Sequence, residues 1–265
     1  MSLGKSTLLA ILEEGYSVNL VITLRDESAP EKSGRVFLDD VCGIYRIPLV
    51  KVDSINDVEV LLSEENLDWM FVVGWSQIIP EEILRIFNYQ VIGAHPTLLP
   101  QGRGRAPIPW AIIKKLSVTG VSFFKMDNGV DSGPIIYQES IELSDTETAT
   151  TLYASVTRLH KVGIKNVMRA ISRDQLVLEY QDESRASYWP KRTPSDGVIT
   201  STCSLAEALT LVRALTRPYP GARVDYNGKT LVIWKASVVR ESLSDLSINL
   251  RDGIFFAHNY EFLDN

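Results

Sequence analysis

The 265-residue chain predicts an α/β fold in which a mostly parallel sheet carries helices on both faces and is followed by a small β-rich domain. Three observations lead to this prediction. Short apolar stretches alternate with amphipathic ones over the first two-thirds of the chain, the composition changes after Ile171, and the last third consists mainly of strand-like segments. Strands that alternate with helices form parallel sheets whose two faces are both covered.

Apolar, β-branched stretches place the expected strands, and apolar residues at helical spacing place the expected helices. Strands are expected at residues 18–24, 46–52, 69–74, 91–94, 120–126, 135–143, 222–226, 230–239 and 253–258. Helices are expected at residues 35–45, 58–65, 80–87, 108–115, 145–171 and 204–215. Residues 69–74 are apolar almost throughout, which predicts a buried strand.

The chain divides into a main domain at residues 1–185, a proline-marked linker at 186–200 and a second domain at 201–265. Near its start, Gly4-Lys-Ser-Thr7 copies the tail of a phosphate-binding P-loop, but the upstream glycine and the preceding strand of such a loop are missing. We therefore expect a helix to begin here, with Ser6 or Thr7 near its N-cap.

Composition excludes several classes of protein. The net charge of −6 argues against a broad surface for nucleic acid, and no apolar stretch reaches the roughly 20 residues that span a bilayer. Cys42 and Cys203 lie far apart and are expected to be buried thiols, and none of the three histidines has a second ligand beside it, so no metal site is expected. Because no signal-peptide pattern opens the chain, we expect a cytoplasmic protein without membrane contacts.

His95 is the first candidate catalytic residue. It ends an apolar strand and enters a loop with two prolines and several glycines, and its imidazole can exchange protons near neutral pH. Asp131 lies in a second glycine-rich turn, which follows the strand at 120–126. Ligands of parallel sheets bind at the carboxyl ends of the strands, so these loops and the one at 74–80 are expected to share one rim.

Together, His95 and Asp131 form a general base with a carboxylate that orients it or receives its proton. No serine or cysteine occupies a G-x-S-x-G elbow, so covalent catalysis is not expected. Such a pair is suited to deprotonating an amine that attacks an activated acyl group.

His95-Pro-Thr-Leu-Leu-Pro100, with Arg103-Gly104 and Ala106-Pro107, is similar to the H-P-S-L-L-P-x-x-R-G-x-x-P signature of the 10-formyltetrahydrofolate-dependent formyltransferases. The Asp131-Ser-Gly-Pro-Ile135 run resembles their D-x-G-x-I segment, and the similarity continues through the linker and the second domain. The resemblance implies a Rossmann-like catalytic domain, an OB-like barrel at the C-terminus, and formyl transfer from N10-formyltetrahydrofolate to a primary amine. It places His95 as general base and Asp131 beside it.

The resemblance also suggests ligand residues. Backbone groups around two loops would hold the pterin, at Trp75, Gln77, Ile78, Met126, Asp127 and Val130. Arg103 and Arg105 are candidates for a substrate diphosphate or carboxylate, because a guanidinium presents two parallel donors. For Arg103, a structural pair that ties the loop down is the competing interpretation.

Two departures from the family pattern matter. The family usually has an asparagine two residues before the histidine, to bind the developing oxyanion, and this chain has Gly93. A backbone N–H, protonated His95 or Asn128 could stand in, since loss of one such donor typically costs about 10²–10³ in rate. In addition, the family's opening strand is not visible before Ser6, so the sheet could lack an interior strand.

Three acceptors remain open at this point. The Arg-Gly-Arg-Ala-Pro run resembles enzymes that formylate a nucleotide-linked amino-dideoxy sugar, a small-molecule substrate. Methionyl-tRNA formyltransferase is the alternative, although after residue 200 seven basic residues are offset by seven acidic ones. A protein that binds or hydrolyses formyltetrahydrofolate without amine transfer is the third reading, motivated by Gly93. The sequence leaves room for a homodimer.

Overall fold

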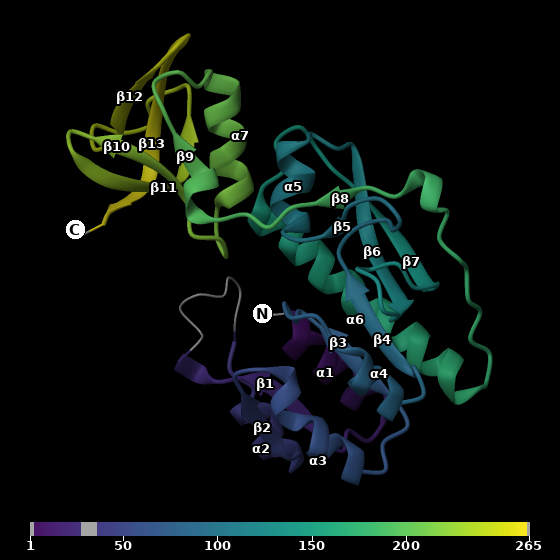
Figure 1. Ribbon diagram of the computed structural model, residues 1–265. Helices are drawn as coiled ribbons and strands as arrows, with labels where there is room; N and C mark the ends of the chain where they lie inside the picture. The colour runs from purple at the N-terminus through teal and green to yellow at the C-terminus, as the bar shows by residue number, and fades with distance from the viewer. Residues whose placement is uncertain (1–2, 28–35, 264–265) are drawn as a thin grey trace. The chain divides into compact units, whose positions relative to one another are not determined.

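The computed structural model describes residues 3–27 and 36–263 (Figure 1). The chain folds as two compact units. The first unit comprises Met1–Gly104, Thr119–Ile141 and Ser155–Tyr188, and the second comprises Arg105–Val118, Glu142–Ala154 and Trp189–Asn265. The second unit therefore includes two segments from the middle of the chain in addition to its C-terminal third.

The first unit contains the α/β architecture that the sequence predicts. Its hydrogen-bonded sheets have the orders β1-β2 and β3-β4-β6-β7. β1 pairs with β2 and β3 with β4 in parallel, whereas β6 runs antiparallel to β4. The strands are β1 (Val21–Leu24), β2 (Leu49–Val52), β3 (Met70–Val73), β4 (Val91–His95), β6 (Val118–Lys125) and β7 (Ile135–Glu142).

β3 differs from its prediction, because it is half-buried rather than buried. It pairs with β4 along one edge, and among residues 3–27 and 36–263 no strand pairs with its other edge or with the free edge of β1. β1 to β4 still contribute to one apolar cluster, in which Val52 and Val91 pack with the half-buried Ile22 and Val72.

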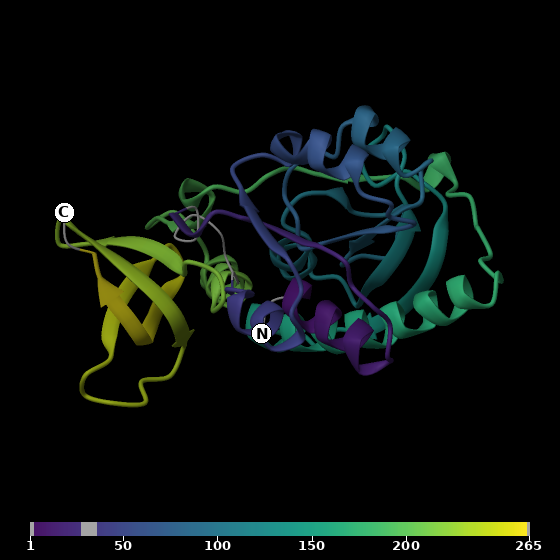
Figure 2. The same cartoon turned by 90° about the horizontal axis from the view of Figure 1, so that it is seen from below.

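Helices cover both faces of the strands in the first unit, as Figure 2 shows, with α3 and α4 on one side and α1 and α6 on the other. Lys165 and Arg169 of α6 pair with Glu13 and Glu14 at the end of α1, which joins the two helices of one face. The helices are α1 (Leu3–Glu13), α2 (Asp39–Tyr45), the 3-10 turn η2 (Ile55–Val58), α3 (Glu59–Glu64), α4 (Glu81–Ile86) and α6 (Ala149–Ser172). None of the described helices is long and apolar enough to cross a bilayer.

The start of α1 corrects one prediction. Ser6 and Thr7 lie inside the helix rather than at its N-cap. Both side chains are buried, and their hydroxyls have no hydrogen-bond partner among residues 3–27 and 36–263. The predicted helix at 35–45 begins at Asp39, and residue 35 lies outside the described residues. Cys42 is buried as expected, but Cys203 is only half-buried.

The second unit is built on a five-stranded sheet of order β12-β13-β11-β10-β9, with α5 (Pro107–Ile113) packed against α7 (Leu205–Leu215). Its strands are β9 (Val198–Ile199), β10 (Ala222–Tyr226), β11 (Lys229–Ser237), β12 (Leu246–Leu250) and β13 (Gly253–Phe262). A strand-rich C-terminal region is confirmed, although β9 and β12 were not predicted. The described residues also form shorter elements: β5 (Arg103–Gly104), η3 (Glu183–Arg185), β8 (Tyr188–Trp189) and η4 (Pro194–Gly197).

Candidate active site

His95 is the last residue of β4, where the strand delivers a buried imidazole to the edge of the sheet. The ring atom Nε2 lies 2.8 Å from the carbonyl oxygen of Gly102, at the far end of the loop that follows. Because a carbonyl can only accept, Nε2 carries the proton in this bond. In a neutral ring the lone pair is then on Nδ1.

Asp131 lies in the turn after β6, and its backbone has φ = +53°, a left-handed conformation that non-glycine residues adopt rarely. Its Oδ2 accepts a hydrogen bond of 2.8 Å from the backbone N–H of Gly104 and lies 3.5 Å from His95 Nδ1. The structure thus brings together the two side chains that the sequence singled out. The lone pair of Nδ1 and the Asp131 carboxylate are two neighbouring acceptors.

Arg103 is not available to a substrate, which corrects its assignment as a binding residue. Its side chain is fully buried, and it donates two hydrogen bonds to Glu183 and further ones to Gln181 and the Tyr188 hydroxyl. The bonds to Glu183 are the main cause that raises the pKa of the guanidinium above its ordinary value. The competing interpretation, a structural pair that ties down the loop, is the one that these contacts support.

Two residues at the predicted pterin loops have side chains with structural partners. Gln77 accepts a bond from the Ile55 N–H and donates to the Asp53 carbonyl, so its side-chain amide joins two loops of the first unit. Asp127 accepts bonds from the Gly129 N–H and the Ser132 hydroxyl, as a turn-forming aspartate does. Both side chains therefore already hydrogen-bond other groups of the protein.

Of the other residues predicted to hold the formyl donor, two have exposed side chains. Ile78 and Val130 have exposed fractions of 79% and 47%, and they belong to the loops after β3 and β6. Trp75 is half-buried, and its indole N–H is buried without a partner among the described residues. Met126 packs beside Gly93.

Arg105 is exposed and belongs to the second unit, where its backbone N–H bonds to the Trp189 carbonyl. Asn128, one candidate for the missing oxyanion donor, is exposed.

The position of the missing asparagine is filled. A Cβ on Gly93 would lie 2.8 Å from Cζ and 2.9 Å from Cε1 of Phe124, and 3.2 Å from Cγ of Met126. Phe124 is the cross-strand partner of Gly93, and its ring occupies the space above it. No side chain at position 93 can therefore reach the site while Phe124 stays in place.

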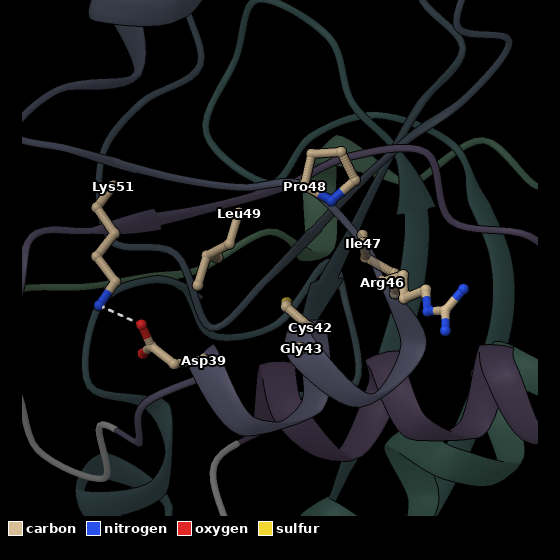
Figure 3. Close-up of a pocket in the computed structure, with 8 residues that line it drawn as sticks. All are labelled: Asp39, Cys42, Gly43, Arg46, Ile47, Pro48, Leu49 and Lys51. Carbon is tan, nitrogen blue, oxygen red and sulfur yellow. Dashed lines mark ion pairs between the residues drawn. The ribbon is translucent and has the colours of Figure 1, made fainter.

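A separate pocket of about 500 Å³ lies beside α2 and β2 (Figure 3). Lys51 lines it and pairs with Asp39 at 2.7 Å and with Asp26 at 2.6 Å, so its charge is balanced. Burial raises the pKa of the Cys42 thiol, which makes it a poor nucleophile. None of the predicted site residues lines this pocket.

Sequence reasoning missed the residues that hold His95 and Asp131 in place. Gly102 and Gly104 contribute backbone groups, while Gln181 and Ser187 contribute side chains from the last segment of the first unit. Gln181 donates to the carbonyls of Asp131 and Gly133, and Ser187 accepts from the Gly102 N–H. Bonds to backbone atoms leave no side-chain pattern, and only a family alignment could have pointed to these positions.

The sequence matches the formyl transferase family over residues 51–170 and the C-terminal domain of formyl transferases over residues 191–254. A methionyl-tRNA formyltransferase of Caldanaerobacter subterraneus is 34% identical over 242 residues, which cover 88% of this chain and 77% of the relative.

Solved structures share the fold. An N-formyltransferase of Helicobacter canadensis, determined with folinic acid and dTDP-3-aminofucose, superposes with a TM-score of 0.71 at 18% identity, covering 96% of this chain and 95% of that one. A methionyl-tRNA formyltransferase of Clostridium thermocellum gives a TM-score of 0.65 at 20% identity, covering 94% of this chain and all of that one. With both domain matches in order and a relative of this identity, the chain belongs to the formyl transferase family.

Proposed function

We propose that this protein is an N-formyltransferase that moves the formyl group of N10-formyltetrahydrofolate to the primary amine of a nucleotide-linked amino-dideoxy sugar. The observation that carries the proposal is the pairing of His95 Nδ1 with Asp131 Oδ2 at 3.5 Å. Two acceptors side by side require a donor, and a primary ammonium group offers three N–H bonds.

His95 acts as the general base through Nδ1. The Gly102 carbonyl keeps the proton on Nε2, so the opposite nitrogen faces the amine and removes its proton. Asp131 stabilises the positive charge that the ring acquires, and the Gly104 N–H keeps its carboxylate in place. When bound, N10-formyltetrahydrofolate supplies the formyl carbon that the free amine nitrogen attacks. His95 gives that proton to the departing folate nitrogen. As a neutral base again, it takes the second proton from the attached amine nitrogen, so that a neutral formamide and tetrahydrofolate are the products and one proton is released.

The loops after β3 and β6, which are predicted to hold the formyl donor, suit a flat, polar aromatic ring. Ile78 and Val130 expose apolar side chains, and Trp75 has a buried indole N–H without a partner in the described parts of the chain. A pterin has apolar faces and carbonyl or nitrogen acceptors at its edge, so it complements both features. This complementarity supports the donor assignment.

The developing oxyanion needs a donor that Gly93 does not supply. Once His95 has accepted the amine proton, Nδ1–H becomes a donor at the reacting centre, in place of the usual amide. We expect turnover to be slower than with an asparagine by about 10²–10³. If the Nδ1–H of His95 does not stabilise the oxyanion, the protein binds folate without transferring the formyl group, which is the third alternative.

For the acceptor, charge favours a small nucleotide sugar. After residue 200 the chain has seven basic and seven acidic residues, so this region is neutral where tRNA binding would require a basic surface. Arg105 is exposed and can bind a diphosphate. The Helicobacter canadensis enzyme, similar in fold, was determined with a nucleotide-linked amino sugar. The 34% identity to a methionyl-tRNA formyltransferase favours the alternative acceptor.

One experiment separates the candidates. The purified protein is incubated with N10-formyltetrahydrofolate and either a panel of dTDP-, UDP- and GDP-linked amino sugars or methionyl initiator tRNA, and products are identified by mass spectrometry. Formylation of a nucleotide sugar alone supports the proposal. Formylation of the tRNA alone establishes the alternative, and stoichiometric folate binding without either product establishes the third reading.

A further inference from the structure

The segment Gln181–Tyr188, here called the strap, touches both loops that carry the catalytic pair. Ser187 accepts a hydrogen bond of 2.9 Å from the Gly102 N–H through its hydroxyl, and its carbonyl accepts one of 2.9 Å from the Arg103 N–H. At the other end, Gln181 contacts the turn of Asp131. The strap therefore links the His95 loop to the Asp131 turn.

Gln181 has its full set of hydrogen bonds. Its Nε2 donates to the carbonyls of Asp131 at 2.8 Å and Gly133 at 2.7 Å. Its Oε1 accepts from Nε and Nη2 of Arg103 at 3.1 and 2.9 Å. An amide can donate two bonds and accept two, so this orientation is fixed on both sides. Arg103, fully buried and held by Glu183 and Tyr188, anchors the arrangement.

The bond from Gln181 reaches the backbone where it is strained. Asp131 adopts φ = +53°, a left-handed conformation that costs free energy for a residue with a side chain and that contacts with its surroundings can stabilise. Gln181 holds the carbonyl of this residue, and the Gly104 N–H, next to the anchored Arg103, holds its carboxylate. The backbone conformation and the side-chain direction of Asp131 are thus both set by one network.

The same network reaches His95. The Gly102 carbonyl binds Nε2 of the imidazole, and the N–H of the same residue binds Ser187 of the strap. The 3.5 Å separation of His95 Nδ1 from Asp131 Oδ2 therefore depends on how the strap holds the two loops together. Reacting groups are sensitive to such placement, because an error of 1 Å can cost about 10²-fold in rate.

We propose that Gln181 is a positioning residue for catalysis: it sets the geometry of the His95–Asp131 pair without touching the substrate, as part of a strap that joins the two catalytic loops. The proposal rests on the proposed function, in which these two side chains deprotonate the amine.

The test replaces the amide by a carboxylate. Gln181→Glu keeps the size and the attraction to Arg103, but it removes both donors and places negative oxygen against the Asp131 and Gly133 carbonyls. Gln175→Glu makes the same chemical change at an exposed site six residues earlier and serves as the matched control. Ser187→Ala removes a single hydrogen bond at the other end of the strap. It tests the same link between the loops if Gln181→Glu does not fold.

Three quantities are measured: kcat and KM for amine and donor, the thermal unfolding midpoint, and the pH titration of the His95 ring by nuclear magnetic resonance, assigned with His95→Asn. For Gln181→Glu we expect kcat to fall by about 10- to 100-fold, with KM for the donor within about threefold, and a changed His95 titration. Ser187→Ala should change the same quantities in the same direction by less, and Gln175→Glu should match the wild type.

A wild-type kcat and an unchanged His95 titration in folded Gln181→Glu would overturn the proposal, whatever happens to the unfolding midpoint. If no amine is formylated by the wild type, the proposed function fails. The His95 titration still decides whether the strap sets the geometry of the pair, since it requires no substrate.

Discussion

The packing around Gly93 explains why no side chain is present at this position. Phe124 lies directly across the strand pair, and its ring covers the α-carbon of Gly93 at a distance that leaves no room for a methyl group. The absence of the family's asparagine is therefore coupled to the presence of a large aromatic residue on the neighbouring strand. Restoring the amide requires a change at both positions.

Replacing Gly93 with alanine should destabilise the protein by about 1–3 kcal/mol, because the new methyl group overpacks against the buried Phe124 ring. Urea unfolding of Gly93→Ala measures this. Gly43→Ala is the control, since a Cβ there meets no atom within 4 Å and the residue lies in α2. That variant should be neutral or more stable by about 0.5–1 kcal/mol. Equal stability of the two variants would contradict the packing argument.

A second residue, His160 of α6, is buried and uncharged. Its Nδ1 bonds to the Val156 carbonyl at 2.8 Å, its ring meets the edge of Phe123, and its Nε2 has no partner in the described residues. Burial lowers the pKa of this imidazole from 6.5 to about 4. Between those two values the unfolded chain binds a proton that the folded protein excludes, so stability falls as the pH falls.

The replacement His160→Leu removes this effect. Lowering the pH from 7 to 5 should therefore cost the wild type about 2 kcal/mol more than the variant. Urea unfolding of both proteins at the two pH values gives the difference, in which the other titrating groups cancel. A pH dependence that is the same in both proteins would show that His160 is protonated in the folded state.

At the scale of elements, the caps of α7 show what a sequence can specify. Ser204 is the N-cap, its hydroxyl accepts from the Glu207 N–H, and the Glu207 carboxylate accepts from the Ser204 N–H. This capping box is local and visible in the sequence, and the helix was predicted at 204–215, close to its observed bounds.

Removing that cap should weaken the second unit. Ser204→Ala leaves the Glu207 N–H without its partner and should lower the free energy of unfolding by about 1 kcal/mol. Ser201→Ala, an exposed serine three residues earlier, should have an effect near zero. Thermal unfolding of both variants tests the comparison, and a cap variant as stable as the control would count against it.

Elements that depend on distant partners could not be predicted in this way. β5 and β8 are two-residue strands whose pairing joins Arg103 to Ser187, 84 positions later in the numbering. Segments as short as β5 and β8 take their conformation from the strand they join, so only the tertiary structure reveals them. β12 (Leu246–Leu250) is a different case, because it alternates apolar and polar residues, which is the pattern of a half-buried strand, and the prediction overlooked it.

The candidate site also contains residues that could be predicted from the sequence and residues that could not. His95 and Asp131 were found because their side chains carry chemistry and lie in recognisable loops, and the structure places them 3.5 Å apart. Arg103 was a candidate for the substrate, and a sequence does not show that a charged side chain is already satisfied by buried partners. Gln181 was missed, since it acts on backbone atoms.

For the whole molecule, charge separates the two possible acceptors. A net charge of −6 and a neutral C-terminal region give tRNA phosphates little to bind. We expect no gel retardation of initiator tRNA at about 0.15 M salt, where a tRNA enzyme of this family would form a complex. Retardation that weakens steeply with added salt would instead show a basic surface, and it would favour the tRNA alternative.

The most direct test of the central claim is formyl transfer itself, measured by mass spectrometry with N10-formyltetrahydrofolate and the panel of nucleotide-linked amino sugars. The wild type should formylate at least one sugar at its amine. Asp131→Asn, which keeps the shape of the side chain but removes its charge, should lower kcat by about 10²-fold or more while the protein stays folded. Transfer at the wild-type rate by Asp131→Asn would contradict the account, because the amine would then be activated without the His95–Asp131 pair.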